Sequence, residues 1–116
     1  MTARRVALVV PVVLALVVAL IVAPAPALAE DAAKIFAKSC APCHGKEGEP
    51  NAVFAKQGVR SFKDQAWQKA ATDAQIEKSI REGKKGTMMA SFDKLFSAEE
   101  IKGLVAYVRK LGSAKK

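Results

Sequence analysis

The two cysteines and the only histidine of this 116-residue sequence lie within five consecutive positions, Cys40-Ala-Pro-Cys43-His44. A disulfide between the two cysteines would close a very short loop and would therefore stabilise the fold little. A structural zinc site needs four ligands, and the sequence has only these three Cys and His side chains. A thioredoxin-like Cys-x-x-Cys requires β-strands around it, and no strand-like alternation is visible. All three interpretations are disfavoured, so the motif needs another explanation.

The N-terminal segment has the three parts of a secretory signal peptide. Arg4 and Arg5 precede an uncharged run over residues 6–22, and Ala-Pro-Ala-Leu-Ala follows at residues 25–29. A positive head, an apolar run and a small-residue ending predict cleavage after Ala29. An uncleaved membrane anchor is the alternative, but the run falls just short of the roughly 20 apolar residues that a spanning helix needs. We therefore expect a periplasmic protein with no membrane span after cleavage.

Residues 30–116 form a single domain that is too small to bury a large core, and such domains usually need a disulfide, a metal or a cofactor. In an exported chain, Cys-x-x-Cys-His is the attachment sequence of c-type haem. Cys40 and Cys43, spaced for a helical turn, can reach the two vinyl groups of one porphyrin and form thioethers. The adjacent His44 then lies beneath the iron as an axial ligand. Because there is no second histidine, we expect one covalently attached haem c.

The first half of this domain is predicted to contain one helix, a loop and a short helical piece. Asp31 is a suitable N-cap for a helix that runs to Cys40. Residues 45–60 are rich in Gly, Pro and Asn and are predicted to be mostly loop. A short helix is expected over residues 64–71, where the only tryptophan lies.

Two capping boxes mark the helices of the second half. Thr72-Asp-Ala-Gln75 opens a helix that Gly83 ends, and Ser97-Ala-Glu-Glu100 opens a last helix that Gly112 ends. Residues 84–95 between them are predicted to be a loop. The last helix places apolar residues at the spacing of an amphipathic helix, namely Ile101, Leu104, Val105, Val108 and Leu111. The predicted fold class is therefore all-α, with three to five helices around the haem.

Methionine is the expected second axial ligand, because electron-transfer cytochromes typically hold haem by His and Met. Met88 and Met89 are the only methionines after the leader, and they lie in a glycine-containing loop rather than on a helix face. No nucleophile, general base or substrate cleft is visible, so we expect an electron carrier and not an enzyme. A small haem peroxidase or gas sensor with an open sixth position is the alternative.

The sequence resembles the class I cytochrome c family over essentially the whole of residues 30–116. Phe36 lies four residues before Cys40, as the first-helix aromatic residue of that family does. Leu104 and Tyr107 match the pair in the last helix that packs against this aromatic residue. Ala32 stands where the family often has glycine, at the crossing of these two helices.

The same resemblance distinguishes the two methionines. Met89-Ala-Ser-Phe92 resembles the family's Met-Pro-x-Phe ligand loop, with Ala90 in place of proline. The Gly86-Thr87 pair before the methionines would favour Met88 as the ligand. The distances to Phe92 and to the capping box at Ser97 favour Met89, which is our prediction because the capping box fixes the helix start.

Two further residues are candidates for contacts with the haem propionates. Trp67 is similar to the family tryptophan that hydrogen-bonds a haem propionate, although it could equally be a core residue. Arg60 is a second candidate to pair with a propionate, unless it is simply exposed. We also expect the second ring nitrogen of His44 to donate to a backbone carbonyl. Pro50, the proline available for this role, lies too near His44 to match the family position.

The chain is basic, with 19 Lys and Arg, 11 Asp and Glu and a net charge of +8. Export, scattered basic residues and few aromatic residues argue against a nucleic-acid partner. We therefore expect a monomer that meets redox proteins through acidic docking surfaces on those proteins. The lysines expected near the haem edge are Lys46, Lys56, Lys84, Lys85 and Lys94.

Overall fold

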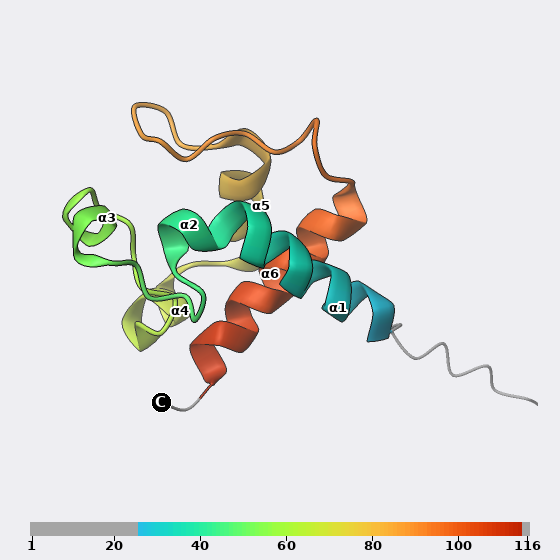
Figure 1. Cartoon of the computed structure of the whole chain (residues 1–116), viewed down its shortest axis with the longest axis horizontal. Coiled ribbons are helices and arrows are strands. Elements are labelled where there is room, and N and C mark those ends of the chain that lie inside the picture. The colour runs from blue at the N-terminus through green and yellow to red at the C-terminus, as the bar shows by residue number, and fades with distance from the viewer. Residues whose placement is uncertain (1–25, 115–116) are drawn as a thin grey trace, which may run out of the picture.

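The computed structural model describes residues 26–114, whose regular secondary structure is entirely helical, with no β-strand among them (Figure 1). The helices are α1 (Pro26–Ile35), a π-helix (Phe36–Cys40), α2 (Ala41–His44), α3 (Ala52–Lys56), α4 (Gln65–Ala70), α5 (Asp73–Glu82) and α6 (Ala98–Ser113). The all-α prediction is thus confirmed. The leader predicted for residues 1–29 lies largely outside the described residues, and its cleavage site after Ala29 stays a prediction.

The first helix differs from its prediction at both ends. It begins at Pro26, so Asp31 lies inside the helix and is not its N-cap. The residues before Asp31 include Leu28 and Ala29, which are strong helix formers and extend the helix backward. At the other end the helical segment passes through the π-helix to Cys40, continues beyond Cys40 as α2, and ends at His44. The attachment motif therefore lies on the last turns of one continuous helical segment.

Residues 45–60 are mostly loop, as predicted, but they also contain one short helix, α3, that was not predicted. The side-chain oxygen of Asn51 accepts hydrogen bonds from the backbone N–H groups of Val53 and Phe54, at 3.0 and 3.1 Å. Asn51 therefore acts as an N-cap, a role for which asparagine is as well suited as for a turn. Composition alone did not separate these two roles.

Both predicted capping boxes are confirmed. The backbone N–H of Gln75 donates to Thr72 Oγ1 at 3.1 Å, and Thr72 N–H donates to Gln75 Oε1 at 2.9 Å. At α6, Glu100 N–H donates to Ser97 Oγ at 3.1 Å, and Ser97 N–H donates to Glu100 Oε2 at 2.7 Å. Gly83 follows α5 as predicted.

Gly112 does not end α6 as predicted; the helix continues to Ser113. Gly112 is buried, and a Cβ atom there would lie 2.3 Å from Gln68 Nε2. The glycine is thus explained by close packing between α6 and α4 and not by a helix stop.

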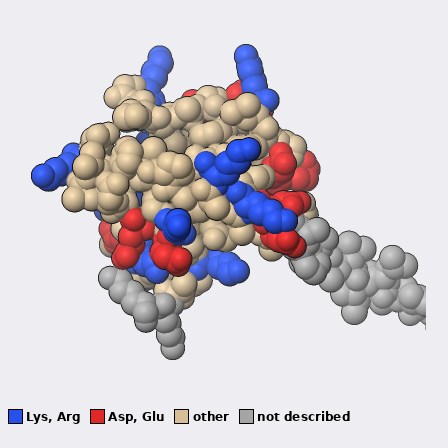
Figure 2. Space-filling view, in the orientation of Figure 1, with Lys and Arg blue, Asp and Glu red and all other residues tan. Residues whose placement is uncertain are grey.

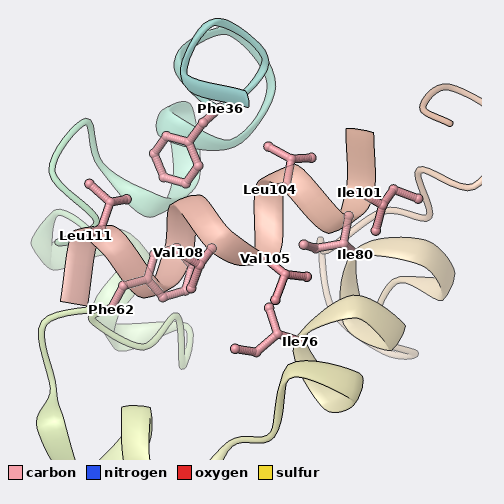
Figure 3. Packing of buried hydrophobic residues seen from close by; sticks show 9 residues of the cluster. All are labelled: Phe36, Phe62, Ile76, Ile80, Ile101, Leu104, Val105, Val108 and Leu111. Carbon is pink, nitrogen blue, oxygen red and sulfur yellow. The ribbon is translucent and has the colours of Figure 1, made fainter. Parts of the chain in front are cut away.

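The hydrophobic core is built around α6 (Figure 3). Its least exposed large side chains are Phe36, Ile101 and Leu104, each no more than 2% exposed. Helix α1 crosses α6 closely at Ala32 and Gly103. A Cβ atom added to Gly103 would lie 3.5 Å from the Cβ of Ala32. The small residue opposite Ala32 is therefore Gly103. The predicted packing of Phe36 against Tyr107 is confirmed, with ring centroids 5.0 Å apart.

A polar network joins α6 to α4 and to the start of α5. The Nη1 atom of Arg109 donates to the main-chain and side-chain oxygens of Gln68, at 2.6 and 2.8 Å. Its Nη2 donates to the Ala71 carbonyl at 2.6 Å, and its Nε donates to Asp73 Oδ1 at 2.8 Å. This network could not be predicted from local sequence patterns, because its partners lie far apart in the sequence.

Candidate functional site

A cavity of about 290 Å³ with largely apolar walls lies between the end of the first helical segment, α5, α6 and two loops. All the residues predicted for the site line this cavity, as does Met88: Cys40, Cys43, His44, Arg60, Trp67 and Met89. The fold thus brings together an N-terminal motif and a methionine loop that are far apart in the sequence.

The attachment motif presents two free thiols and one imidazole to this cavity. Cys40 and Cys43 are both partly buried. Burial, with a smaller contribution from Cys43, raises the pKa of the Cys40 thiol to about 11. A thiol-redox centre needs a lowered thiol pKa, so the local environment of Cys40 is opposite to what that alternative requires.

His44 is held at the C-terminal end of α2 by a sharp turn in the chain. Gly45, the next residue, has a φ of +79°, and a Cβ atom there would lie 1.9 Å from the Glu49 carbonyl oxygen. Glycine is therefore required at this turn. Burial lowers the pKa of His44, which favours the neutral imidazole that binds metals.

The surroundings of the His44 ring differ from the expected hydrogen bond between its second ring nitrogen and a backbone carbonyl. Its Nδ1 atom is buried and has no hydrogen-bond partner among residues 26–114, so the expected carbonyl acceptor is absent from this part of the chain. The imidazole instead stacks on the Phe62 ring, with centroids 4.8 Å apart and an interplanar angle of 18°. Phe62 was not identified from the sequence, since an isolated aromatic residue in a polar loop carries no periodic signal.

The two methionines have different environments. Met89 is half-buried and packs against the hydrophobic core, whereas Met88 is 75% exposed. The Met89 carbonyl accepts from Lys84 N–H at 3.0 Å, and Met89 N–H donates to Thr87 Oγ1 at 3.2 Å. The backbone on both sides of the Met89 side chain is thus fixed by the loop itself.

The methionine loop is also joined to the end of α5. Phe92 N–H donates to the Ile80 carbonyl at 3.1 Å, and Ser91 Oγ donates to the Arg81 carbonyl at 2.7 Å. The rings of Phe92 and Phe96 stack with centroids 5.4 Å apart. These contacts give the loop a defined position although it contains no regular secondary structure.

Trp67 and Arg60 lie on a different part of the cavity wall. The half-buried Trp67 ring packs against Phe62, with centroids 5.3 Å apart. Arg60 is exposed and forms an ion pair with Asp64, from Nη2 to Oδ2 at 3.0 Å. This hydrogen bond is the main reason that the pKa of Asp64 is lowered. The predicted contacts of Trp67 and Arg60 with haem propionates stay predictions.

Comparison with known proteins shows the family. Residues 27–108 match the family model described as cytochrome C oxidase, cbb3-type, subunit III. The chain belongs to this family of c-type cytochromes. As a c-type cytochrome it carries covalently bound haem c, as the sequence predicted. The cavity fits such a group, because its walls are largely apolar and two free thiols and the His44 imidazole line it.

Relatives of this cytochrome include long and short proteins. It is 37% identical over 84 residues to the cbb3-type cytochrome c oxidase subunit FixP of Azorhizobium caulinodans, and the aligned region covers 72% of this chain and 27% of FixP. It is 33% identical over 86 residues to cytochrome c-553 of Nitratidesulfovibrio vulgaris, and the aligned region covers 73% of this chain and 80% of that protein. The chain thus spans about a quarter of FixP and most of cytochrome c-553.

A solved structure supports the same cytochrome fold. The KustC0563 c-type cytochrome superposes on this chain with a TM-score of 0.65 and 36% sequence identity. The match covers 70% of this chain and 96% of that structure. Within residues 26–114, none of the helices is both long and apolar enough to cross a membrane.

Proposed function

We propose that this cytochrome is a single-electron carrier with one haem, joined to the chain through Cys40 and Cys43. In this proposal His44 and Met89 would hold the iron of that haem. The observation that carries it is that His44 and the half-buried Met89 line the same cavity. Haem supplies an iron atom that alternates between the ferrous and ferric states. The role of the chain is to hold a constant set of ligands in a dry pocket, so that little structure changes with each electron.

Each part of the cavity contributes to this role. Burial lowers the pKa of His44 and so favours the neutral imidazole, which can bind a metal. Hydrogen bonds from Lys84 and to Thr87 hold the Met89 backbone. The largely apolar walls of the cavity suit an apolar ring system. None of the side-chain hydrogen bonds among the described residues joins a nucleophile of the cavity to a base. These features favour electron transfer over an enzymatic reaction.

We infer that the partners are other redox proteins in the periplasm. Several relatives are named as subunits of cbb3-type cytochrome c oxidases, which supports a respiratory partner. The five lysines predicted near the haem edge are exposed, and Lys84 lines the cavity. Figure 2 shows basic side chains projecting from several places on one face. These charges would attract acidic docking surfaces to a monomeric cytochrome.

The test is a visible spectrum of the protein, expressed with the machinery that attaches haem. The expected reduced spectrum is that of a six-coordinate c-type cytochrome. The expected ferric spectrum contains the weak methionine-to-iron charge-transfer band at the red edge of the visible range. Absence of this band, together with carbon monoxide binding by the reduced protein, would replace the proposal with an open sixth position, as in a haem peroxidase or a gas sensor.

A further inference from the structure

One face of the His44 imidazole lies against an aromatic ring. His44 and Phe62 are stacked, with an interplanar angle of 18°. A metal-bound histidine usually has its orientation fixed by a hydrogen bond from its second ring nitrogen. The His44 Nδ1 atom is buried and makes no such bond within residues 26–114. Among the described residues, the stacking contact with Phe62 is therefore left as the contact that fixes the plane of the His44 ring.

Phe62 is itself firmly held through its backbone. Its N–H donates to the Gly48 carbonyl at 2.8 Å, and its carbonyl accepts from Gln68 Nε2 at 2.7 Å. Gly48 packs closely against Phe62: a Cβ atom added to Gly48 would lie only 3.1 Å from the Cβ of Phe62. The backbone of Phe62 thus has a defined position relative to the turn that follows His44.

The Phe62 ring is also confined by its neighbours. It is only 8% exposed. The Phe36 ring lies at a centroid distance of 6.3 Å, and the Trp67 ring lies at 5.3 Å. These neighbours restrict the positions that the Phe62 ring can take, so it offers His44 a surface with a defined orientation.

We propose that Phe62 is a positioning residue for His44, which sets the orientation of the imidazole plane by stacking in place of a hydrogen bond. This inference rests on the proposed function, in which His44 binds the iron. The orientation of the axial imidazole and the hydrogen bonding of its Nδ1–H both influence the iron. Phe62 thereby helps to determine the reduction potential without touching the metal.

The experiment compares the haem-loaded protein with Phe62→Leu and with Phe36→Leu as a matched control. Both phenylalanines are buried and line the cavity, but of the two only Phe62 is stacked on His44. Because His44 is the only histidine, isotopically labelled histidine gives a single set of ring signals. In Phe62→Leu these signals should lose the shielding of the Phe62 ring, and the reduction potential should shift. In Phe36→Leu the His44 signals should stay nearly unchanged.

The parent protein supplies a test that needs no variant. Its nuclear Overhauser spectrum should contain contacts between the ring protons of His44 and Phe62. Absence of these contacts would overturn the inference, and so would equal shifts of the His44 signals in the two variants. A parent spectrum without a histidine-bound iron would instead defeat the proposed function, so the two failures are distinguishable.

Discussion

Gly83 and the Met89 carbonyl are so close that a Cβ atom on Gly83 would lie 2.6 Å from that oxygen. The end of α5 therefore directly limits where the methionine loop can run. Gly83 also has a φ of +72°, a conformation that L residues with side chains rarely adopt.

Gly83→Ala is expected to displace the methionine loop. The backbone strain alone should cost about 1–3 kcal/mol, and the clash with the Met89 carbonyl should weaken the methionine-to-iron band. The control is Gly86→Ala, because Gly86 has a similar φ of +74° and nothing within 4 Å of its added Cβ. Thermal unfolding and the ferric spectrum check both variants. Equal weakening of the band in both would show that strain, and not the clash, is responsible.

Met89→Ala should abolish the charge-transfer band and lower the reduction potential, because Met89 is the half-buried methionine with a fixed backbone. Met88→Ala should retain the band, since the Met88 side chain is 75% exposed. The measurements are the ferric spectrum and a redox titration. If the Met88 variant loses the band while the Met89 variant keeps it, the assignment of the ligand is reversed.

Cys40→Ser combined with Cys43→Ser should give a largely unfolded chain. A cavity of about 290 Å³ left without its haem would cost roughly 7 kcal/mol at about 24 cal/mol per Å³. This is comparable with the total stability of a small domain, which is about 5–15 kcal/mol. Circular dichroism during heating is the measurement. Full helicity with a cooperative transition would contradict the expectation.

Arg109→Ala should destabilise the fold by roughly 2–3 kcal/mol, because hydrogen bonds to charged groups contribute more than neutral ones and the carbonyls of Gln68 and Ala71 lose their donor. The control is Lys78→Ala, which removes an exposed ion pair with Glu82 and should cost less than about 1 kcal/mol. Denaturant unfolding of the haem-loaded protein compares the two. Similar losses in both variants would show that the network contributes no more than a surface ion pair.

Electron transfer to a small anion should be steered by the lysines near the haem edge. Oxidation of the reduced protein by hexacyanoferrate(III) is expected to slow as salt shortens the Debye length from about 10 Å at 0.1 M to about 3 Å at 1 M. Lys84→Glu, at the cavity wall, should slow the reaction more than Lys69→Glu on α4. Rates that are independent of salt in stopped-flow measurements would mean that these lysines are merely solvated.

The sequence predicted those parts of the fold that depend on local signals. The capping boxes at Thr72 and Ser97 were found because both partners of each box lie within one turn. The apolar face of α6 could be predicted because its apolar residues recur at the spacing of a helix. The Cys40–His44 motif indicated the cofactor because haem attachment needs the two cysteines and the histidine within a few positions of one another.

The parts that were missed depend on contacts between distant segments. Gly112 looks like a helix stop, and only the position of Gln68 shows that it is a packing glycine. Phe62 has no pattern around it, and its stacking on His44 depends on how the loop that carries Phe62 meets the end of α2. The same holds for Arg109, whose partners belong to α4 and the start of α5.

The crossing of α1 and α6 at Ala32 and Gly103 joins the beginning of the domain to its end. Phe36 and the apolar side chains of α6 belong to one core, so this core cannot close until α6 packs against the helical segment that carries Cys40 and Cys43. Before that step the two cysteines lie on an open chain, where the enzymes that form thioether bonds can reach them. Attachment of the haem would then come before the packing of α6.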